Sequence, residues 1–279
     1  MKRFVSILLS AVLLLSVFSV FGFAKDTKKY VVIGDSIARG AGVLNPDEAC
    51  YGIMVANTNG YSYANLGIDG ITSKVLLGLL EREDFQNHIS SADIISLSIG
   101  GNDYLTSNLI KLFIDAEITH KYDDFYKIRD SFYNNFSLII GKMKALNPNA
   151  LILVQTVYNM RHDFLMGVNR IGANLLNECY YRYLEENPGA YVIIDVSSKL
   201  TGTWDCLAFD TIHPNGKGNK EIAKLILAEL KSQGLGTATE PVIKIEPIEQ
   251  FKLGIVQLYR VVSYYIRYFR AYIPAPLSR

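Results

Sequence analysis

The sequence has few cysteines, and their spacing gives no structural framework. Its 279 residues include three, Cys50, Cys179 and Cys206. An odd number of cysteines at irregular spacing does not build a disulfide scaffold, although one disulfide bridge is possible if the protein is exported. None of the three forms a Cys-x-x-Cys pair, which argues against a zinc or redox site. We therefore interpret them as structural or incidental.

An excess of charge of one sign is also missing. The chain has 28 Lys and Arg against 27 Asp and Glu, a net charge of +1, and this balance argues against a nucleic-acid partner. Only 20% of residues are charged and 49% are hydrophobic, which excludes disorder for most of the chain. A chain of this length can bury a sizeable core without disulfide or metal support. It shows no internal repeat or low-complexity segment.

The first 24 residues have the pattern of an export signal. Lys2 and Arg3 precede an apolar stretch over residues 4–21, and Gly22 and Ala24 are the small residues expected at −3 and −1. We predict cleavage after Ala24, and hence a secreted or cell-envelope protein. The alternative is an uncleaved membrane anchor, because the apolar run approaches spanning length.

The other end of the chain has a different character. Residues 237–247 contain two prolines and are predicted to be a linker, and residues 248–273 have apolar side chains every three or four positions, which indicates an amphipathic helix. From residue 256 onward there are four arginines and no acidic residue, with tyrosines between them. Basic residues with aromatics suit contact with a membrane surface or a partner. Packing of this helix against the body of its own chain is an equally good interpretation.

The body, residues 25–236, alternates apolar strands with helices. Strands are predicted at residues 29–33, 61–66, 93–99, 150–157 and 191–196, and helices at 72–81, 105–118, 125–146, 161–186 and 218–232. This alternation predicts one α/β domain with a five-stranded parallel sheet covered on both faces. In such sheets ligands bind beyond the carboxyl ends of the strands.

Polar clusters follow these strands. Gly34-Asp35-Ser36 follows the first, residues 65–70 the second and residues 100–103 the third, while residues 210–214 lie between the fifth strand and the last helix. Each cluster alone is composed of ordinary turn residues. Together they predict one polar site along one edge of the sheet.

The residue types suit nucleophilic acyl transfer. Ser36, at a strand-to-helix turn, is the candidate nucleophile, His213 the general base and Asp210 the residue that orients the imidazole. A tetrahedral intermediate also needs hydrogen-bond donors for its oxyanion. The candidates are the Ser36 N–H, the Gly67 N–H and the Asn102 side-chain amide.

The four clusters resemble the blocks of the SGNH/GDSL hydrolase superfamily. The motifs Gly-Asp-Ser, Asn-x-Gly, Gly-x-Asn-Asp and Asp-x-x-His occur in that order, and the resemblance covers roughly residues 30–230. It implies a flavodoxin-like three-layer α/β/α sandwich and a carboxylic-ester hydrolase that needs no metal or other cofactor. It also implies the same roles for Ser36, Gly67, Asn102, Asp210 and His213. The one small departure is Ile37, where the family has Leu.

Further polar residues follow the fourth predicted strand. His162, beside Asp163, is a rival general base, but it has no third group to orient it. We expect Tyr158, Arg161 and His162 to line the substrate pocket instead.

The favoured function is that of an exported serine esterase or lipase-like acylhydrolase acting on a small-molecule, lipid or acetylated-glycan ester. An envelope polysaccharide deacetylase or an O-acyltransferase would use the same site. A non-catalytic surface-binding protein would use only the basic aromatic tail. The sequence leaves the acyl chain and the alcohol open, although membrane contact by residues 248–273 would favour a lipid.

Overall fold

The computed structural model describes residues 27–159 and 165–250, and its centre is one five-stranded sheet. The strands all run parallel in the order β2-β1-β3-β4-β5. Their bounds are β1 Lys29–Gly34, β2 Ser62–Gly67, β3 Ile94–Ser98, β4 Leu151–Gln155 and β5 Val192–Ile194. This sheet, flanked by helices, confirms the predicted α/β fold.

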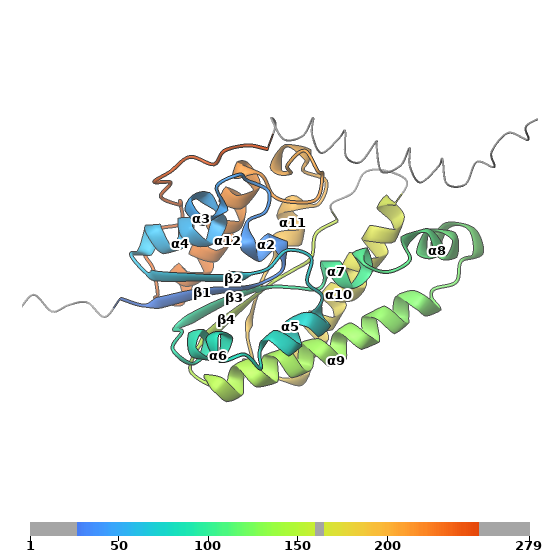
Figure 1. Cartoon of the computed structure of the whole chain (residues 1–279), viewed down its shortest axis with the longest axis horizontal. Helices are drawn as coiled ribbons and strands as arrows, with labels where there is room; N and C mark the ends of the chain where they lie inside the picture. Colours follow the sequence, from blue (N-terminus) through green and yellow to red (C-terminus); the bar gives the residue numbers. More distant parts are fainter. Residues whose placement is uncertain (1–26, 160–164, 251–279) are drawn as a thin grey trace, which may run out of the picture.

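Helices cover both faces of the sheet, giving three layers (Figure 1). One layer contains α2 Ser36–Arg39, α3 Pro46–Ala49, α4 Tyr51–Asn59, α11 Val196–Leu200 and α12 Gly216–Ser232. The opposite layer contains α5 Ser73–Leu79, α6 Glu83–Ser90, α7 Gly101–Leu105, α8 Leu109–Ile114, α9 Asp123–Leu146 and α10 Met166–Glu186. A π-helical turn, η1 Asp115–Thr119, extends α8, and a short 3-10 turn, η2 Trp204–Cys206, precedes α12. Within the described residues no helix is both long and apolar enough to cross a membrane.

The interior strand β1, which lies between β2 and β3, shows why both faces are covered. Val31 and Ile33 pack into the core on the side of α9, while Tyr30 and Val32 pack into the core on the side of α12. All four side chains are fully buried. Successive side chains of a strand point to opposite faces, so a continuous apolar run needs a helical layer on each side.

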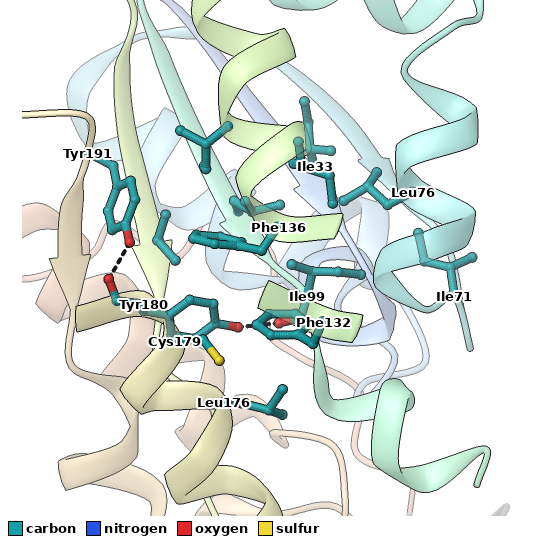
Figure 2. Packing of buried hydrophobic residues seen from close by; sticks show 14 of the residues in the cluster. Ile33, Ile71, Leu76, Ile99, Phe132, Phe136, Leu176, Cys179, Tyr180 and Tyr191 are labelled. Atoms are coloured by element: carbon teal, nitrogen blue, oxygen red, sulfur yellow. Dashed lines mark hydrogen bonds between the residues drawn. The ribbon is translucent and has the colours of Figure 1, made fainter. Parts of the chain in front are cut away.

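An aromatic cluster fills the core under α9 and α10 (Figure 2). The ring centroid of Phe136 lies 4.9 Å from that of Tyr180 and 5.7 Å from that of Tyr191. The Tyr180 hydroxyl donates to the backbone carbonyl of Ile99, at the end of the β3 segment, as the dashed line shows. The core is thereby tied to the loop that follows β3.

Most predicted elements are present, with one helix divided. The predicted helix over residues 105–118 is interrupted between α7 and α8, where Asn108 starts a new helix by accepting from the Lys111 N–H at 3.0 Å. α4 and α6 were not predicted. The three cysteines are buried and unbridged in this structure.

The segment predicted as a linker and the start of a helix lies against the body instead. We call residues 241–250 the C-terminal strap; it runs over the helical layer that contains α3 (Figure 1). Ile248 holds it there, since its N–H donates to Asn45 Oδ1 at 2.8 Å and its carbonyl accepts from the Leu44 N–H at 2.9 Å. Glu249 forms an antiparallel bridge with Val43 and Gln250 is in a turn, so residues 248–250 are not helical. The rest of the predicted amphipathic helix and the predicted signal, residues 1–24, lie outside the described residues.

Candidate active site

Ser36 is positioned by a sharp turn between β1 and α2. Gly34 has φ of +136°, and a Cβ there would lie 1.8 Å from the Ser98 carbonyl oxygen, so the turn requires glycine. Asp35 caps α2, because its Oδ1 accepts from the Ile37 N–H at 3.0 Å. Ser36 is therefore the first helical residue, held at the carboxyl end of β1.

Ser36, His213 and Asp210 form a hydrogen-bonded row. His213 Nε2 lies 2.8 Å from Ser36 Oγ, and His213 Nδ1 lies 2.7 Å from Asp210 Oδ2. An ionised carboxylate only accepts hydrogen bonds, so Nδ1 carries the proton and Nε2 is left to accept from the serine hydroxyl. The structure thus brings together the three residues that the sequence motifs predicted.

The turn that contains Asp210 and His213 is strained. Thr211, between them, has φ of +60°, a conformation that β-branched residues rarely adopt. Asp210 Oδ1 accepts from the N–H groups of Ile212 and His213, each at 2.9 Å, and so holds the turn in this shape. Strain of this kind persists where surrounding contacts over-determine the backbone.

The electrostatics of the pair favour the charged form of both His213 and Asp210. Burial lowers the pKa of His213, but the hydrogen bond and the negative charge of Asp210 outweigh it, so this pKa is raised above its ordinary value. Burial likewise raises the pKa of Asp210, and the hydrogen bond and charge of His213 outweigh that effect and lower it. The pair therefore stabilises the imidazolium that forms when His213 takes a proton.

Two donors face the same place as the serine hydroxyl. Among the described residues none accepts from the Ser36 N–H, which points away from the helix at its first turn. Asn102, on α7, donates one amide hydrogen to the Ile71 carbonyl at 3.0 Å, which orients the amide and leaves its second hydrogen available. Both residues line the cavity described below, and their role as oxyanion donors remains a prediction.

The structure does not support Gly67 as a third donor. Its N–H donates to Asn65 Oδ1 at 2.8 Å, so this hydrogen is already used within the β2 turn. Gly67 is not among the lining residues of the cavity, whereas Gly70 is, with φ of +76° and open space where a Cβ would lie. Which N–H of the Asn65–Gly70 segment is free depends on where the Asn65 side chain turns, so the oxyanion role of Gly67 remains a prediction.

Asp103 supports the same region without lining the cavity. Its carboxylate accepts from the Ser73 N–H at 2.9 Å and from the Ser73 hydroxyl at 2.5 Å, which fastens the start of α5 to α7. Burial raises the pKa of this carboxyl. Asp103 therefore fixes the loops that carry Gly70 and Asn102.

The predicted substrate contact of Tyr158 is replaced by a structural one. The Tyr158 side chain is buried, and its hydroxyl donates to the Ile212 carbonyl at 2.6 Å. Tyr158 thus supports the strained turn before His213 from behind, which no local motif could reveal. Arg161 and His162 lie outside the described residues, so their predicted role in substrate binding remains a prediction.

These groups surround a cavity of about 350 Å³ at the carboxyl edge of the sheet. Asp69 comes from the predicted cluster at residues 65–70, whereas Gln250, from the C-terminal strap, was not expected. The remaining polar lining residues are Asp35, Ser36, Asn102, Asp210 and His213, and the apolar lining comes from Ile37, Ala41, Leu105 and Ile212. A small ester fits a space of this size.

A three-layer α/β/α fold with a Ser–His–Asp row and convergent N–H donors at its sheet edge defines the SGNH class of esterases. The chain belongs to the GDSL-like lipase/acylhydrolase family, whose model matches residues 32–221. Membership of this family supports hydrolase activity on esters.

Known relatives agree with this placement. The chain is 27% identical over 226 residues to YpmR, an uncharacterized protein of Bacillus subtilis, covering 75% of this chain and 85% of that protein. Its fold is similar to that of the lipase Lip_vut3 from a goat rumen metagenome, with a TM-score of 0.59 and 18% identity over 75% of this chain and 99% of the lipase. It is also similar to the acetylxylan esterase Axe2 of Geobacillus stearothermophilus, with a TM-score of 0.57 and 19% identity over 76% and 96% of the two chains. At this identity the two structures show the fold alone.

Proposed function

We propose that this protein is an exported serine-dependent carboxylic-ester hydrolase that works through an acyl-enzyme on Ser36. The observation that carries the proposal is the row from Asp210 through His213 to Ser36, with separations of 2.7 and 2.8 Å, beside the cavity. A base within hydrogen-bond reach of a hydroxyl, itself oriented by a third group, is the arrangement that activates a serine.

In the acylation half, Ser36 Oγ attacks the ester carbonyl carbon as its proton passes to His213 Nε2. The Ser36 N–H and the free amide hydrogen of Asn102 stabilise the negative charge that develops on the carbonyl oxygen. Asp210 stabilises the imidazolium. The intermediate collapses when His213 returns the proton to the departing alcohol oxygen, leaving the acyl group on Ser36.

In the deacylation half, His213 acts as a base a second time. It takes a proton from a water molecule, whose oxygen attacks the acyl carbon, and the same donors hold the oxyanion. Collapse releases the carboxylic acid and returns the proton to Ser36 Oγ. Every step uses side chains of this chain.

The first test removes the nucleophile. Ser36→Ala is expected to lower kcat for p-nitrophenyl acetate and butyrate by about four orders of magnitude, because the acyl-enzyme can no longer form. The matched control is Ser90→Ala, an exposed serine of α6, which should keep wild-type rates. A fluorophosphonate probe should label the wild type and Ser90→Ala but not Ser36→Ala. Hydrolysis that survives Ser36→Ala unchanged would exclude the mechanism.

The substrate class follows from the family and from the size of the cavity. We expect small or acetylated esters, and a profile of p-nitrophenyl esters of increasing acyl length, run beside acetylated xylan, measures the acyl preference. Products formed with added sugar or alcohol acceptors separate hydrolysis from acyl transfer.

Export and membrane contact are part of the proposal. The basic n-region, apolar run and small residues at 22 and 24 support export, and N-terminal sequencing of the mature protein should begin at Lys25. The basic aromatic character of residues 248–273 supports contact with an anionic membrane surface, which co-sedimentation with phosphatidylglycerol vesicles measures. A chain that keeps its first 24 residues would instead be anchored.

A further inference from the structure

Gln250 reaches the catalytic cavity from a part of the chain outside the family match. It lies 29 residues beyond the matched range 32–221, so the family assigns it no role. The C-terminal strap brings it there through Ile248 and through Glu249, whose Oε1 accepts from the Gly216 N–H at 3.0 Å. The position of Gln250 is therefore fixed from two sides.

In the side-chain amide of Gln250 the nitrogen has a hydrogen-bond partner, and the oxygen has none among the described residues. Only 8% of the residue is exposed, and Nε2 donates to the Ala41 carbonyl. This contact assigns the amide orientation, because two carbonyl oxygens would repel each other there. Oε1 is then a buried acceptor, and no described residue donates to it. A buried acceptor without a donor is costly, so a site that keeps one is suited to a ligand that brings a donor.

Contacts of Ala41 and its neighbour place Gln250 on the His213 side of the cavity. A Cβ on Gly42 would lie 1.8 Å from the Pro214 carbonyl oxygen and 3.1 Å from the His213 carbonyl carbon, so this loop packs directly on the histidine turn. Asn102, in contrast, is held by Ile71 on the other side. In ester hydrolysis His213 protonates the departing alcohol, so the alcohol part of the substrate lies on the side of Gln250.

We propose that Gln250 determines specificity by accepting a hydrogen bond from a hydroxyl group on the alcohol part of the ester, so that the substrates are esters of neutral polyhydroxylated alcohols. The proposal rests on the proposed ester hydrolysis. The same cavity is lined by the carboxylates of Asp35, Asp69 and Asp210, and Asp69 is paired with Arg39 at 2.8 Å. No lysine or arginine is among the described lining residues, so the lining does not favour an anionic alcohol. A sugar and a glycerol unit both present such a hydroxyl beside the ester.

The first test compares kcat/KM of the wild-type enzyme for three acetates of similar size. 2-Hydroxyethyl acetate can donate to Oε1, 2-methoxyethyl acetate carries an oxygen but no donor, and propyl acetate has neither. We expect kcat/KM for the hydroxyethyl ester to exceed both others by roughly tenfold, the effect of one hydrogen bond to an otherwise unpaired group. Equal values for the three acetates would overturn the proposal.

The second test removes the acceptor. Gln250→Met keeps the length of the side chain, and the preference for 2-hydroxyethyl acetate over propyl acetate should fall to within about twofold, since no oxygen remains to accept. The control is Ile248→Ala, which trims a side chain that is 54% exposed, keeps the backbone bonds of the strap and should retain the preference. A preference that persists in Gln250→Met contradicts the role. If this variant does not fold, the wild-type comparison still decides.

Failure of the two proposals can be told apart. A wild-type protein that hydrolyses none of the three acetates nor p-nitrophenyl acetate overturns the proposed function and this inference with it. Hydrolysis without the hydroxyl preference overturns this inference alone. Comparing methyl 2-O-acetyl-xylopyranoside with glycerol monoacetate then identifies the source of the hydroxyl, and a higher kcat/KM for either one names the natural alcohol.

Discussion

Asp210 contacts His213 through both of its carboxylate oxygens, one on the ring and one on the backbone N–H. Asp210→Asn removes the charge that raises the pKa of His213, while burial, which lowers it, remains. His213 must be neutral to accept the Ser36 proton, so activity is lost as the pH falls through this pKa. The acid limb of kcat/KM should therefore move to lower pH in the variant. Its maximum should fall by about four orders of magnitude.

A matched change separates charge from hydrogen bonding. Asp69 also raises the pKa of His213, but only through its charge. Asp69→Asn should shift the acid limb in the same direction by a smaller amount, measured over the same pH range. If the limb does not move in Asp210→Asn, a group other than His213 controls it.

The row of Ser36, His213 and Asp210 was predictable, but the contacts of its nearest neighbours were not. Asp210 and His213 share one turn, and Ser36 follows a buried strand, so local spacing and the rule for sheet edges bring them together. Whether the Gly67 N–H is free depends on the hydrogen bond that it donates to Asn65 Oδ1, which leaves no mark in a motif. Residue types can be read from a sequence more safely than the direction of a backbone N–H.

At the scale of the element, α2 carries Ser36 at its first position and is capped by a buried carboxyl group, that of Asp35. Asp35 caps this four-residue helix and also accepts from the Ser98 hydroxyl at 3.1 Å. Burial raises its pKa to about 6, above the ordinary 3.8. A raised acid pKa means that the contribution of Asp35 to stability is fully present below pH 3.8 and is lost as the pH rises through 6.

Asp35→Asn tests this cost, because asparagine keeps the cap but cannot ionise. Relative to the variant, the free energy of unfolding of the wild type should decrease between about pH 4 and pH 6 by up to roughly 3 kcal/mol and then level off. Urea unfolding of both proteins at intervals from pH 4 to 8 measures the difference. A difference that stays constant with pH would show that Asp35 is not buried in its charged form.

The other elements show where the sequence was sufficient. Strands were predicted to within one or two residues because a buried parallel strand is a short apolar run with turn residues at its end. α4 was missed because Tyr51, Met54 and Val55 are all buried and give no polar face. The predicted helix over 105–118 was divided because the cap at Asn108 outweighs a periodicity that continues through it.

At the scale of the whole molecule, the aromatic cluster joins the layers. Phe136 is fully buried, and Phe136→Ala should lower the free energy of unfolding by about 3–5 kcal/mol, because it leaves a cavity between α9, α10 and the sheet. Leu138→Ala, two residues along α9 and 55% exposed, should change stability by less than about 0.5 kcal/mol. Chemical unfolding of both variants measures the contrast, and similar losses would contradict the packing in Figure 2.

The strap could not be predicted, since its contacts join distant parts of the chain. Its two prolines and polar residues gave it the pattern of a linker, and its partners Val43, Leu44 and Asn45 lie some 200 residues earlier. Such pairings depend on the finished fold and not on local periodicity.

The separation of Ala41 and Gln250 along the chain, 209 residues, sets the order in which the lining of the cavity is made during synthesis. The chain is made from its N-terminus, so Ala41 is made early and Gln250 late. The lining of the cavity is therefore complete only when the C-terminal strap has docked. Closing such a long loop costs little more entropy than closing one of half the length. The last contact that completes the cavity therefore forms at small additional cost in loop-closure entropy.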